Sequence, residues 1–190
     1  MTIAAVLLAA GAGSRFDGSE HKLLAELNGR PVVSWALDAV IEAGFNEVIV
    51  VTGAVDLGAL VPEGVTVVHA DRWADGQALT LKAGLEAADA AGHRAVVVGL
   101  ADQPFVPPSA WRSVGASRGA IVAATFDGER RPPVKLERTV WHLLPDEGDA
   151  GARDLIRARP DLVSEVPCSG TAADIDTTED LARWNSPTTS

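Results

Sequence analysis

The sequence predicts an α/β fold in which a mostly parallel sheet carries helices on its faces. Short β-branched or apolar runs alternate with longer segments of helical periodicity, and glycine or proline marks many of their ends. The chain shows no internal repeat and no linker long enough to separate two domains. We therefore expect a single domain over residues 1–185 and a Ser/Thr/Pro-rich tail at 186–190 that frays.

The expected strands are uninterrupted runs of four to six residues rich in valine, isoleucine, leucine and alanine. They are Ile3–Leu8, Glu47–Thr52, Val65–His69, Ala95–Leu100, Ala120–Thr125 and Val163–Val166. The Asp127-Gly128 pair predicts a tight turn that leads into a further extended segment.

The expected helices are bounded by start and stop signals. Pro31–Ala43 begins with proline and stops before Gly44. Gln77–Ala91 likewise stops before a glycine, Gly92. Ala150–Ala158 follows Asp149 as a cap, and Thr177–Trp184 carries acidic residues in its first turn.

Composition restricts the partners. Of the 190 residues 47% are apolar, enough for one sizeable core, and 16 Lys and Arg against 26 Asp and Glu give a net charge of −10. This charge argues against nucleic acid and anionic membrane as partners. The apolar run Ile3–Ala10 has no basic segment before it and is too short to span a membrane, so we expect a buried strand. One cysteine, Cys168, excludes an internal disulfide framework, which favours a reducing compartment and hence the cytoplasm.

A glycine-rich loop follows the first expected strand, in the segment Leu8–Arg15. Its glycines would let backbone N–H groups approach a phosphate, although a plain strand-end turn explains the same residues. The loop does not match a dinucleotide fingerprint, because Phe16 stands at the third glycine position and no acidic residue ends the second strand. It does not match a P-loop either, because Ser19 stands where the lysine is required.

The string Leu8-Ala9-Ala10-Gly11-x-Gly13-x-Arg15, with Lys22-Leu23-Leu24 and Gly29-x-Pro31 after it, resembles the signature of the MobA-like NTP transferases, which include the molybdenum cofactor cytidylyl- and guanylyltransferases. The resemblance implies a three-layer αβα sandwich of Rossmann-like nucleotidyltransferase type. It also implies that Arg15 and Lys22 are catalytic and hold the phosphates of a nucleoside triphosphate. The nucleotide-binding loop residues would be Leu8, Ala9, Ala10, Gly11, Ala12 and Gly13.

Aspartates at two places suit a metal ion. Asp102 follows the Ala95–Leu100 run, at the strand end where open α/β sheets bind ligands, and otherwise it would cap a turn before Pro104. Asp174 and Asp176 alternate along an extended segment, so both could face one cation, while Asp176 or Thr177 could instead cap the last helix. Mg²⁺ needs only one or two carboxylates besides phosphates and water. The resemblance assigns Mg²⁺ to Asp102, which also borders the nucleotide, with Asp176 or Asp174 as the second ligand.

Further matches to the same family extend the resemblance to Leu181. The segment Trp73–Leu85 borders the nucleotide in relatives, which implies contacts from Gly76 and Thr80. The string Gly148-Asp149-Ala150-Gly151-Ala152-Arg153 resembles the acceptor element, which assigns Gly148, Asp149 and Arg153 to the acceptor. Arg131-Pro132-Pro133-Val134 stands where relatives tend to have Gly-His-Pro-Val, so the histidine is missing, which leaves the acceptor's identity open. The four histidines lack zinc-site spacing, so surface or packing roles are expected for His21, His69, His93 and His142.

The resemblance implies transfer of a nucleoside monophosphate, CMP from CTP, to a phosphorylated acceptor such as molybdopterin, with release of pyrophosphate. The resemblance favours CTP over GTP, because cytidylyl-transferring relatives carry alanine at the position of Ala10, whereas guanylyl-transferring relatives tend to carry glycine. A sugar phosphate or another phosphorylated metabolite is the alternative acceptor, and a nucleotide-binding sensor of the same fold is the alternative function. A dinucleotide oxidoreductase is disfavoured by the loop itself. The resemblance also implies a transient contact with a molybdoenzyme.

Overall fold

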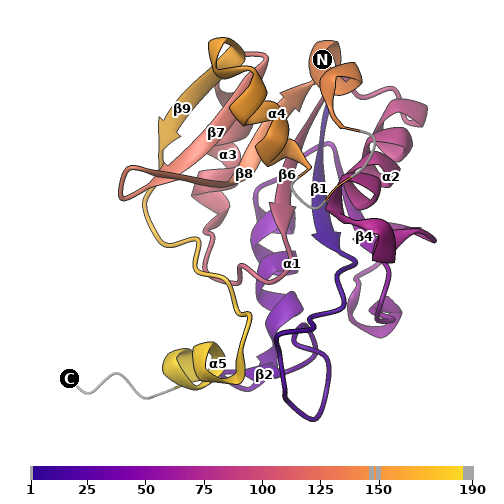
Figure 1. The fold of residues 1–190 in the computed structure, drawn as a ribbon, viewed down its shortest axis with the longest axis vertical. Coiled ribbons are helices and arrows are strands. Elements are labelled where there is room, and N and C mark those ends of the chain that lie inside the picture. The colour runs from indigo at the N-terminus through magenta and orange to yellow at the C-terminus, as the bar shows by residue number, and fades with distance from the viewer. Residues whose placement is uncertain (1, 146–147, 149–150, 186–190) are drawn as a thin grey trace.

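The central element of the fold is a seven-stranded sheet with the order β5-β4-β1-β6-β8-β7-β9 (Figure 1). The computed structural model describes residues 2–145, 148 and 151–185. The strands are β1 (Ile3–Ala9), β4 (Glu47–Thr52), β5 (Thr66–His69), β6 (Ala95–Leu100), β7 (Ile121–Phe126), β8 (Glu129–Glu137) and β9 (Val163–Pro167). Within this sheet only β8 runs antiparallel to its neighbours, so the expected mostly parallel sheet is confirmed.

Helices cover both faces of the sheet. α1 (Val32–Glu42) and α3 (Pro108–Ala116) pack on one face, and α2 (Gln77–Ala90) and α4 (Ala152–Ala158) on the other (Figure 1). A two-stranded hairpin of β2 (Glu26–Leu27) and β3 (Arg30–Pro31) precedes α1, and α5 (Thr178–Asn185) lies against β2. The architecture is therefore a three-layer αβα sandwich. None of the helices in the described part of the chain is long and apolar enough to cross a membrane.

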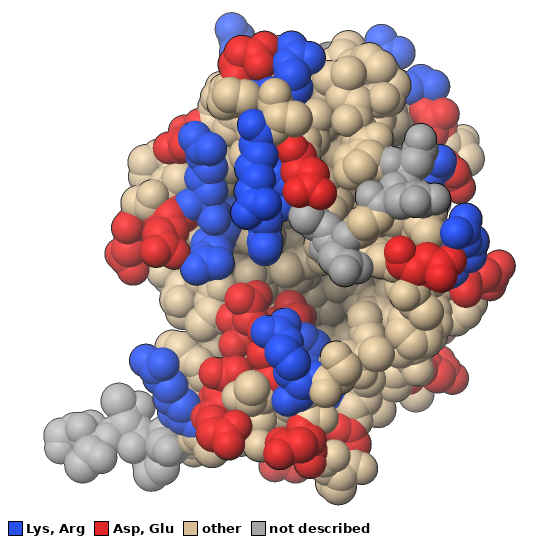
Figure 2. Space-filling model, in the orientation of Figure 1, with Lys and Arg blue, Asp and Glu red and all other residues tan. Residues whose placement is uncertain are grey.

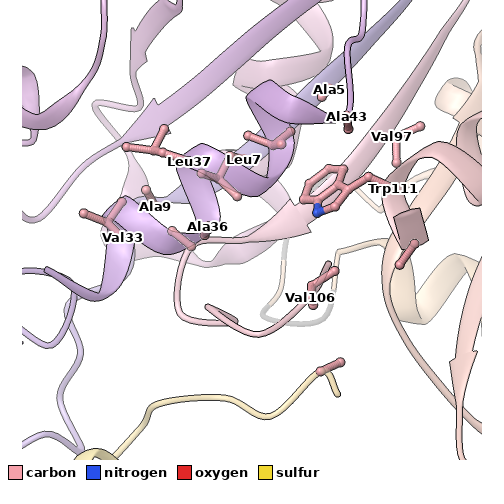
Figure 3. Close-up of a cluster of buried hydrophobic side chains, with 14 of the residues drawn as sticks. Ala5, Leu7, Ala9, Val33, Ala36, Leu37, Ala43, Val97, Val106 and Trp111 are labelled. Atoms are coloured by element: carbon pink, nitrogen blue, oxygen red, sulfur yellow. The ribbon is translucent and has the colours of Figure 1, made fainter. Parts of the chain in front are cut away.

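The two layers of core follow from alternation along the strands. In β1, Ala5 and Leu7 belong to the core cluster of the α1–α3 layer, which also holds Trp111 (Figure 3), while Val6 and Leu8 belong to the cluster of the α2–α4 layer. All four side chains are at most 8% exposed. Successive side chains of a strand face opposite sides, so an uninterrupted apolar run indicates a strand covered on both faces.

Close contact between α2 and the sheet sets the position of the α2 N-terminus. A Cβ atom on Gly84 would lie 2.7 Å from Val6 Cγ1, so only glycine lets α2 approach β1 this closely. Gly76 stands at the N-cap position of α2 with φ 123°, a backbone conformation that favours glycine. The helix thus begins at the carboxyl end of β1, beside the glycine loop.

The β7–β8 hairpin turns at Asp127-Gly128, as predicted, and both residues have positive φ. Its register shifts after Ala123, which pairs with Val134, because the next residue of β7 pairs with Arg131. Pro132 and Pro133, joined by a cis peptide bond, are therefore extra residues on β8. This bulge brings the Arg130–Pro132 segment to the edge of a cavity described below.

The predicted elements are found within one or two residues of their expected ends. The helix expected from Ala150 is observed from Ala152, with Gly151 in the N-cap position, and the expected cap Asp149 lies outside the described residues. The expected tail at 186–190 lies outside them as well. The helix α3 was not expected, and β8 is the extended segment predicted after Asp127-Gly128.

Candidate active site

A cavity of about 400 Å³ opens at the carboxyl ends of β1 and β6, and we call it the loop cavity. The glycine loop forms one wall, the start of α2 forms another, and charged side chains stand at its rim. Its lining residues are Leu8, Ala9, Ala10, Gly11, Ala12, Gly13, Ser14, Arg15, Lys22, Leu23, Trp73, Ala74, Gly76, Gln77, Thr80, Leu100, Asp102 and Asp176. Every residue that the sequence assigned to the nucleotide lines the loop cavity.

Lys22 joins the two aspartates of the loop cavity. Its Nζ lies 2.5 Å from Asp102 Oδ2 and 2.8 Å from Asp176 Oδ1. Arg15 pairs with the other oxygen of Asp176, at 3.0 Å from Nη2 to Oδ2. These groups come from three distant stretches of the chain: the loop after β1, the end of β6 and the segment before α5.

The protonation of Lys22 is secured by this pairing. Its side chain is only 11% exposed, and burial alone would lower the pKa of the ammonium. The charges and hydrogen bonds of Asp102 and Asp176 outweigh the burial, so the net pKa of Lys22 is raised above its ordinary value. The cavity therefore holds a permanent cation between two carboxylates.

Only one of the two carboxylate oxygens of Asp102 accepts a hydrogen bond from the described residues. Its Oδ2 accepts from Lys22, whereas Oδ1 is buried and has no hydrogen-bond partner in the described part of the chain. The backbone carbonyl of Asp102 accepts from the Ile175 N–H at 2.9 Å, which fastens the second aspartate segment to the end of β6. A buried, unpartnered carboxylate oxygen costs free energy unless a ligand takes it up.

Thr177, not Asp176, caps α5. The Thr177 hydroxyl accepts from the Asp180 N–H at 3.1 Å, and Asp180 Oδ2 accepts in return from the Thr177 N–H at 2.9 Å, as in a capping box. Asp176 donates its own N–H to the same Oδ2 at 3.1 Å. The side chain of Asp176 is thus free of capping and faces Arg15 and Lys22.

Asp174 does not share a cavity with the other two aspartates. Ile175 between them is fully buried, which fits the expected alternation, yet Asp174 lines a second cavity and accepts from Gln103 Nε2 at 2.8 Å. Burial, followed by the charge of Asp102, raises the pKa of Asp174. Within the described residues no three acidic, histidine or cysteine side chains gather as one metal site. Of the two alternatives, Asp176 lines the loop cavity with Asp102, and Asp174 does not.

The second cavity, of about 270 Å³, lies between the β7–β8 hairpin and α4, and we call it the hairpin cavity. Its floor is apolar and its rim carries arginines, including the expected Arg153. The lining residues are Leu8, Gln77, Leu81, Val98, Leu100, Gln103, Ala123, Arg130, Arg131, Pro132, Val134, Gly151, Ala152, Arg153, Ile156, Arg157 and Asp174. Figure 2 shows a central hollow with basic side chains gathered over the hairpin side and acidic and basic side chains mixed on the opposite side.

The two cavities adjoin, because Leu8, Gln77 and Leu100 line both. Of the other residues assigned to the acceptor, Gly148 lines neither cavity, and its carbonyl accepts from the Ala78 N–H at 3.0 Å. Asp149 lies outside the described residues. The sequence reasoning missed Gln103 although it follows Asp102 directly, and it missed Arg157, one helical turn after Arg153.

A model of the MobA-like NTP transferase domain matches residues 5–163. The chain belongs to the MobA-like NTP transferase family. Nicotine blue oxidoreductase of Paenarthrobacter nicotinovorans is 31% identical over 199 aligned residues, which cover 95% of each chain. A bifunctional IspD/IspF enzyme of Caulobacter vibrioides is 37% identical over 110 residues, 56% of this chain and 28% of that enzyme.

Solved structures give the same assignment. A nucleotidyl transferase from Methanothermobacter superposes with a TM-score of 0.83 and 26% identity, over 97% of this chain and 96% of its own. Rv0371c from Mycobacterium tuberculosis gives 0.82 and 28% over 97% of both chains, and its complex with manganese gives 0.77 over 97% and 98%. The family and the nucleotidyltransferase fold expected from the sequence are therefore confirmed.

Proposed function

We propose that this member of the family transfers CMP from CTP to a phosphorylated small molecule such as molybdopterin, with Mg²⁺ and with release of pyrophosphate. One observation carries the proposal: Arg15, Lys22, Asp102 and Asp176 meet at the rim of the loop cavity, next to the hairpin cavity. The triphosphate would lie against the glycine loop and the acceptor would lie in the hairpin cavity. Its phosphate would then face the α-phosphate.

The proposed step exchanges one P–O bond for another. An oxygen of the acceptor phosphate attacks the α-phosphorus, the bond from that phosphorus to the β-phosphate oxygen breaks, and pyrophosphate leaves with the bonding electron pair. Charge builds up on the leaving group, where the Arg15 guanidinium and the Lys22 ammonium would neutralise it. Positioning of both substrates does the rest, because no covalent intermediate with the protein is needed.

The carboxylates suit a divalent cation. Asp102 and Asp176 already share one cation, the Lys22 ammonium, and Asp102 keeps a buried oxygen unpartnered. Mg²⁺ would draw charge from the triphosphate oxygens when bound there. Binding of the triphosphate would let Lys22 move from the carboxylates to the phosphates. Rv0371c, which is similar to this chain in structure, was solved in complex with manganese, and this supports a divalent cation here.

CTP is the proposed donor because Ala10 lines the loop cavity near the expected base position. The residue is 2% exposed, and a Cβ on Gly53 would lie 2.8 Å from its methyl group, so most of that methyl packs inside the protein. The preference for CTP over GTP that Ala10 provides should therefore be small.

The proposed acceptor is inferred from the residues that line the hairpin cavity. Its apolar floor suits the ring system of molybdopterin better than a polyhydroxylated sugar, and Arg153 with Arg131 at the rim would take an acceptor phosphate. A sugar phosphate stays the alternative acceptor. Delivery of a molybdopterin nucleotide would require a transient contact with a molybdoenzyme.

A second function has one observation in its favour: the relative that aligns over 95% of both chains is named an oxidoreductase. Reduction by a nicotinamide cofactor would need a dinucleotide site. The loop carries Phe16 in place of the third glycine, and β4 ends at Thr52 without an acidic residue. Nucleotidyl transfer explains the charged cluster and is preferred.

The experiment that tests the proposal is pyrophosphate release across CTP, GTP, ATP and UTP, each with molybdopterin and with a set of sugar phosphates. We expect release with CTP and molybdopterin, and its loss when EDTA removes the metal. NTP binding without pyrophosphate release would favour the sensor function, and oxidation of NADH or NADPH by a quinone-like dye would favour the oxidoreductase. Either result would overturn the proposal.

A further inference from the structure

The side chain of His21 joins two separate parts of the loop cavity. One ring nitrogen, Nε2, lies 2.9 Å from the carbonyl oxygen of Gly11, in the glycine loop. The other, Nδ1, lies 3.2 Å from the backbone nitrogen of Leu23, in the turn that carries Lys22. The imidazole therefore bridges the phosphate-facing loop and the segment that holds the ammonium.

The two hydrogen bonds fix the form of the ring. The Leu23 N–H can only donate, so Nδ1 must be unprotonated and accept. The Gly11 carbonyl can only accept, so Nε2 must carry the proton and donate. Only the neutral Nε2–H tautomer satisfies both partners at once.

Few hydrogen bonds hold the backbone of the glycine loop. The N–H groups of Gly11, Ala12, Gly13 and Ser14 have no hydrogen-bond partner among residues 2–145, 148 and 151–185, which leaves them available to a ligand. The loop carbonyls are held by the Ala54 N–H on Ala10, by His21 on Gly11 and by the Phe16 N–H on Gly13. His21 supplies the tie that comes from the Lys22 segment.

The loop and the Lys22 stem are also in close contact. A Cβ atom on Gly13 would lie 3.1 Å from Lys22 Cγ and 3.4 Å from His21 Nε2. Gly13 has φ 64°, so its backbone curves over the lysine stem. A triphosphate held by both the loop and Lys22 would be sensitive to the spacing between them.

We propose that His21 is a positioning residue for the triphosphate: its Nε2–H donation to the Gly11 carbonyl sets the spacing between the glycine loop and Lys22. The inference rests on the proposed function for the identity of the ligand. His21 itself touches no reacting atom. Its effect is on how well the unpaired loop N–H groups and the ammonium reach the same phosphates.

The two bonds can be separated by substitution. Asparagine places an amide oxygen near the position of Nδ1, so His21→Asn keeps the bond from Leu23 and loses the tie to Gly11. Glutamine places an amide N–H near the position of Nε2, so His21→Gln keeps the tie to Gly11 and loses the other bond. His21→Ala loses both. His142→Asn, an exposed histidine on the helical turn Arg138–Leu143, is the matched control.

The test is calorimetric titration of each variant with CTP and Mg²⁺, with the melting temperature measured in parallel. Loss of one hydrogen bond predicts roughly 3- to 10-fold weaker CTP binding for His21→Asn and His21→Ala. His21→Gln should recover most of the affinity, and His142→Asn should bind like the wild type. In steady-state assays the loss should fall on KM for CTP more than on kcat.

Three results would overturn the inference: glutamine as weak as alanine, asparagine as strong as the wild type, or affinities that simply follow the melting temperatures. If the wild type binds CTP and releases no pyrophosphate with any acceptor, the proposed function fails while the positioning role is still decided by the titrations. If the wild type binds no triphosphate, both fail.

Discussion

The two cavities meet at the same strand ends but are built differently. In the loop cavity, Lys22, Asp102 and Asp176 are 11 to 21% exposed in their side chains and share one ammonium between two carboxylates. In the hairpin cavity, the arginines pair at the surface: Arg130 with Glu165 and Arg131 with Glu129, with 44 to 48% of the arginine side chains exposed.

The difference in exposure between the two sets of ion pairs indicates which part of the proposed site the fold fixes. Exposed ion pairs contribute about 0–1 kcal/mol each, so the rim arginines can exchange a carboxylate partner for a ligand phosphate with little loss. The partly buried pairs of Lys22 are stronger, and their exchange needs an incoming polyanion. We infer that the donor chemistry is fixed, whereas acceptor recognition can change through the rim.

The largest effect is expected from the loop cavity. Asp102→Asn removes the carboxylate charge that would hold the metal cation beside the triphosphate, and it should lower kcat by about 10²- to 10³-fold while the fold persists. Circular dichroism and the melting temperature check the fold, and pyrophosphate release gives the rate. A variant with the wild-type rate would remove Asp102 from the site.

Lys22→Ala should weaken CTP binding and also slow turnover. A charged hydrogen bond contributes about 1.5–3 kcal/mol, which corresponds to a loss of roughly 10- to 150-fold. Because the ammonium acts as a point charge, the difference from the wild type should shrink as salt is added. Equal CTP affinities at low salt would show that Lys22 serves only the two aspartates.

Arg153→Ala should act on the other cavity alone. We expect KM for the acceptor to rise by roughly 10-fold, within the range for a charged hydrogen bond, while the dissociation constant for CTP stays unchanged. Arg159→Ala is the control, because Arg159 lies beyond the end of α4, with 41% of its side chain exposed, and pairs with Asp161. Weaker CTP binding by Arg153→Ala would mean that the two cavities are one site.

The donor base gives a smaller effect. Ala10→Gly should narrow the preference for CTP over GTP without reversing it, because one methyl group discriminates by about 1–3 kcal/mol at most and this one is largely packed away. Competition between equal CTP and GTP measures the ratio. A wild type that favours GTP would reject the assignment of the base.

The smallest effect lies at the opposite end of the sheet. Glu47 accepts from the Thr66 hydroxyl at 2.6 Å and lies 2.8 Å from His93 Nε2, and these contacts, the Thr66 bond first, hold its pKa below the ordinary value. Such a group adds stability above its unfolded pKa, which is lost as pH falls through the folded pKa. Thr66→Val should therefore lower the melting temperature slightly at pH 7, and the difference should shrink as the pH falls below the ordinary pKa of a glutamate and through the lowered pKa of Glu47. A difference that persists in acid would assign the loss to packing.

Most residues of the loop cavity could be predicted from the sequence, whereas those of the hairpin cavity could be predicted only in part, and the physical reasons differ. Arg15, Lys22 and Asp102 each follow a strand or glycine loop whose geometry is set locally, so their convergence could be expected. Asp174 could not be separated from Asp176 by alternation alone, because the contact with Gln103 decides its cavity. Arg131 reaches the hairpin cavity through the bulge of β8, a register shift that no local pattern in the sequence specifies.

The helix α3 shows a different kind of omission. Its start carries Pro107 and Pro108, and the residue that fixes it against the sheet is Trp111, 2% exposed. A Cβ atom on Gly99 of β6 would lie 2.4 Å from the Trp111 ring, so the helix is held by a contact across the core. Helix propensity and the pattern of apolar residues do not reveal tertiary contacts of this kind.

The central claim is that the loop cavity presents an α-phosphate to a phosphate in the hairpin cavity. The most direct test is to follow label from CTP in the presence of Mg²⁺ and molybdopterin. Label on the α-phosphate should appear in the nucleotidylated acceptor, and label on the γ-phosphate should appear in pyrophosphate, in equal amounts. Label that stays in CTP, or α-label that appears as free CMP, would contradict the account.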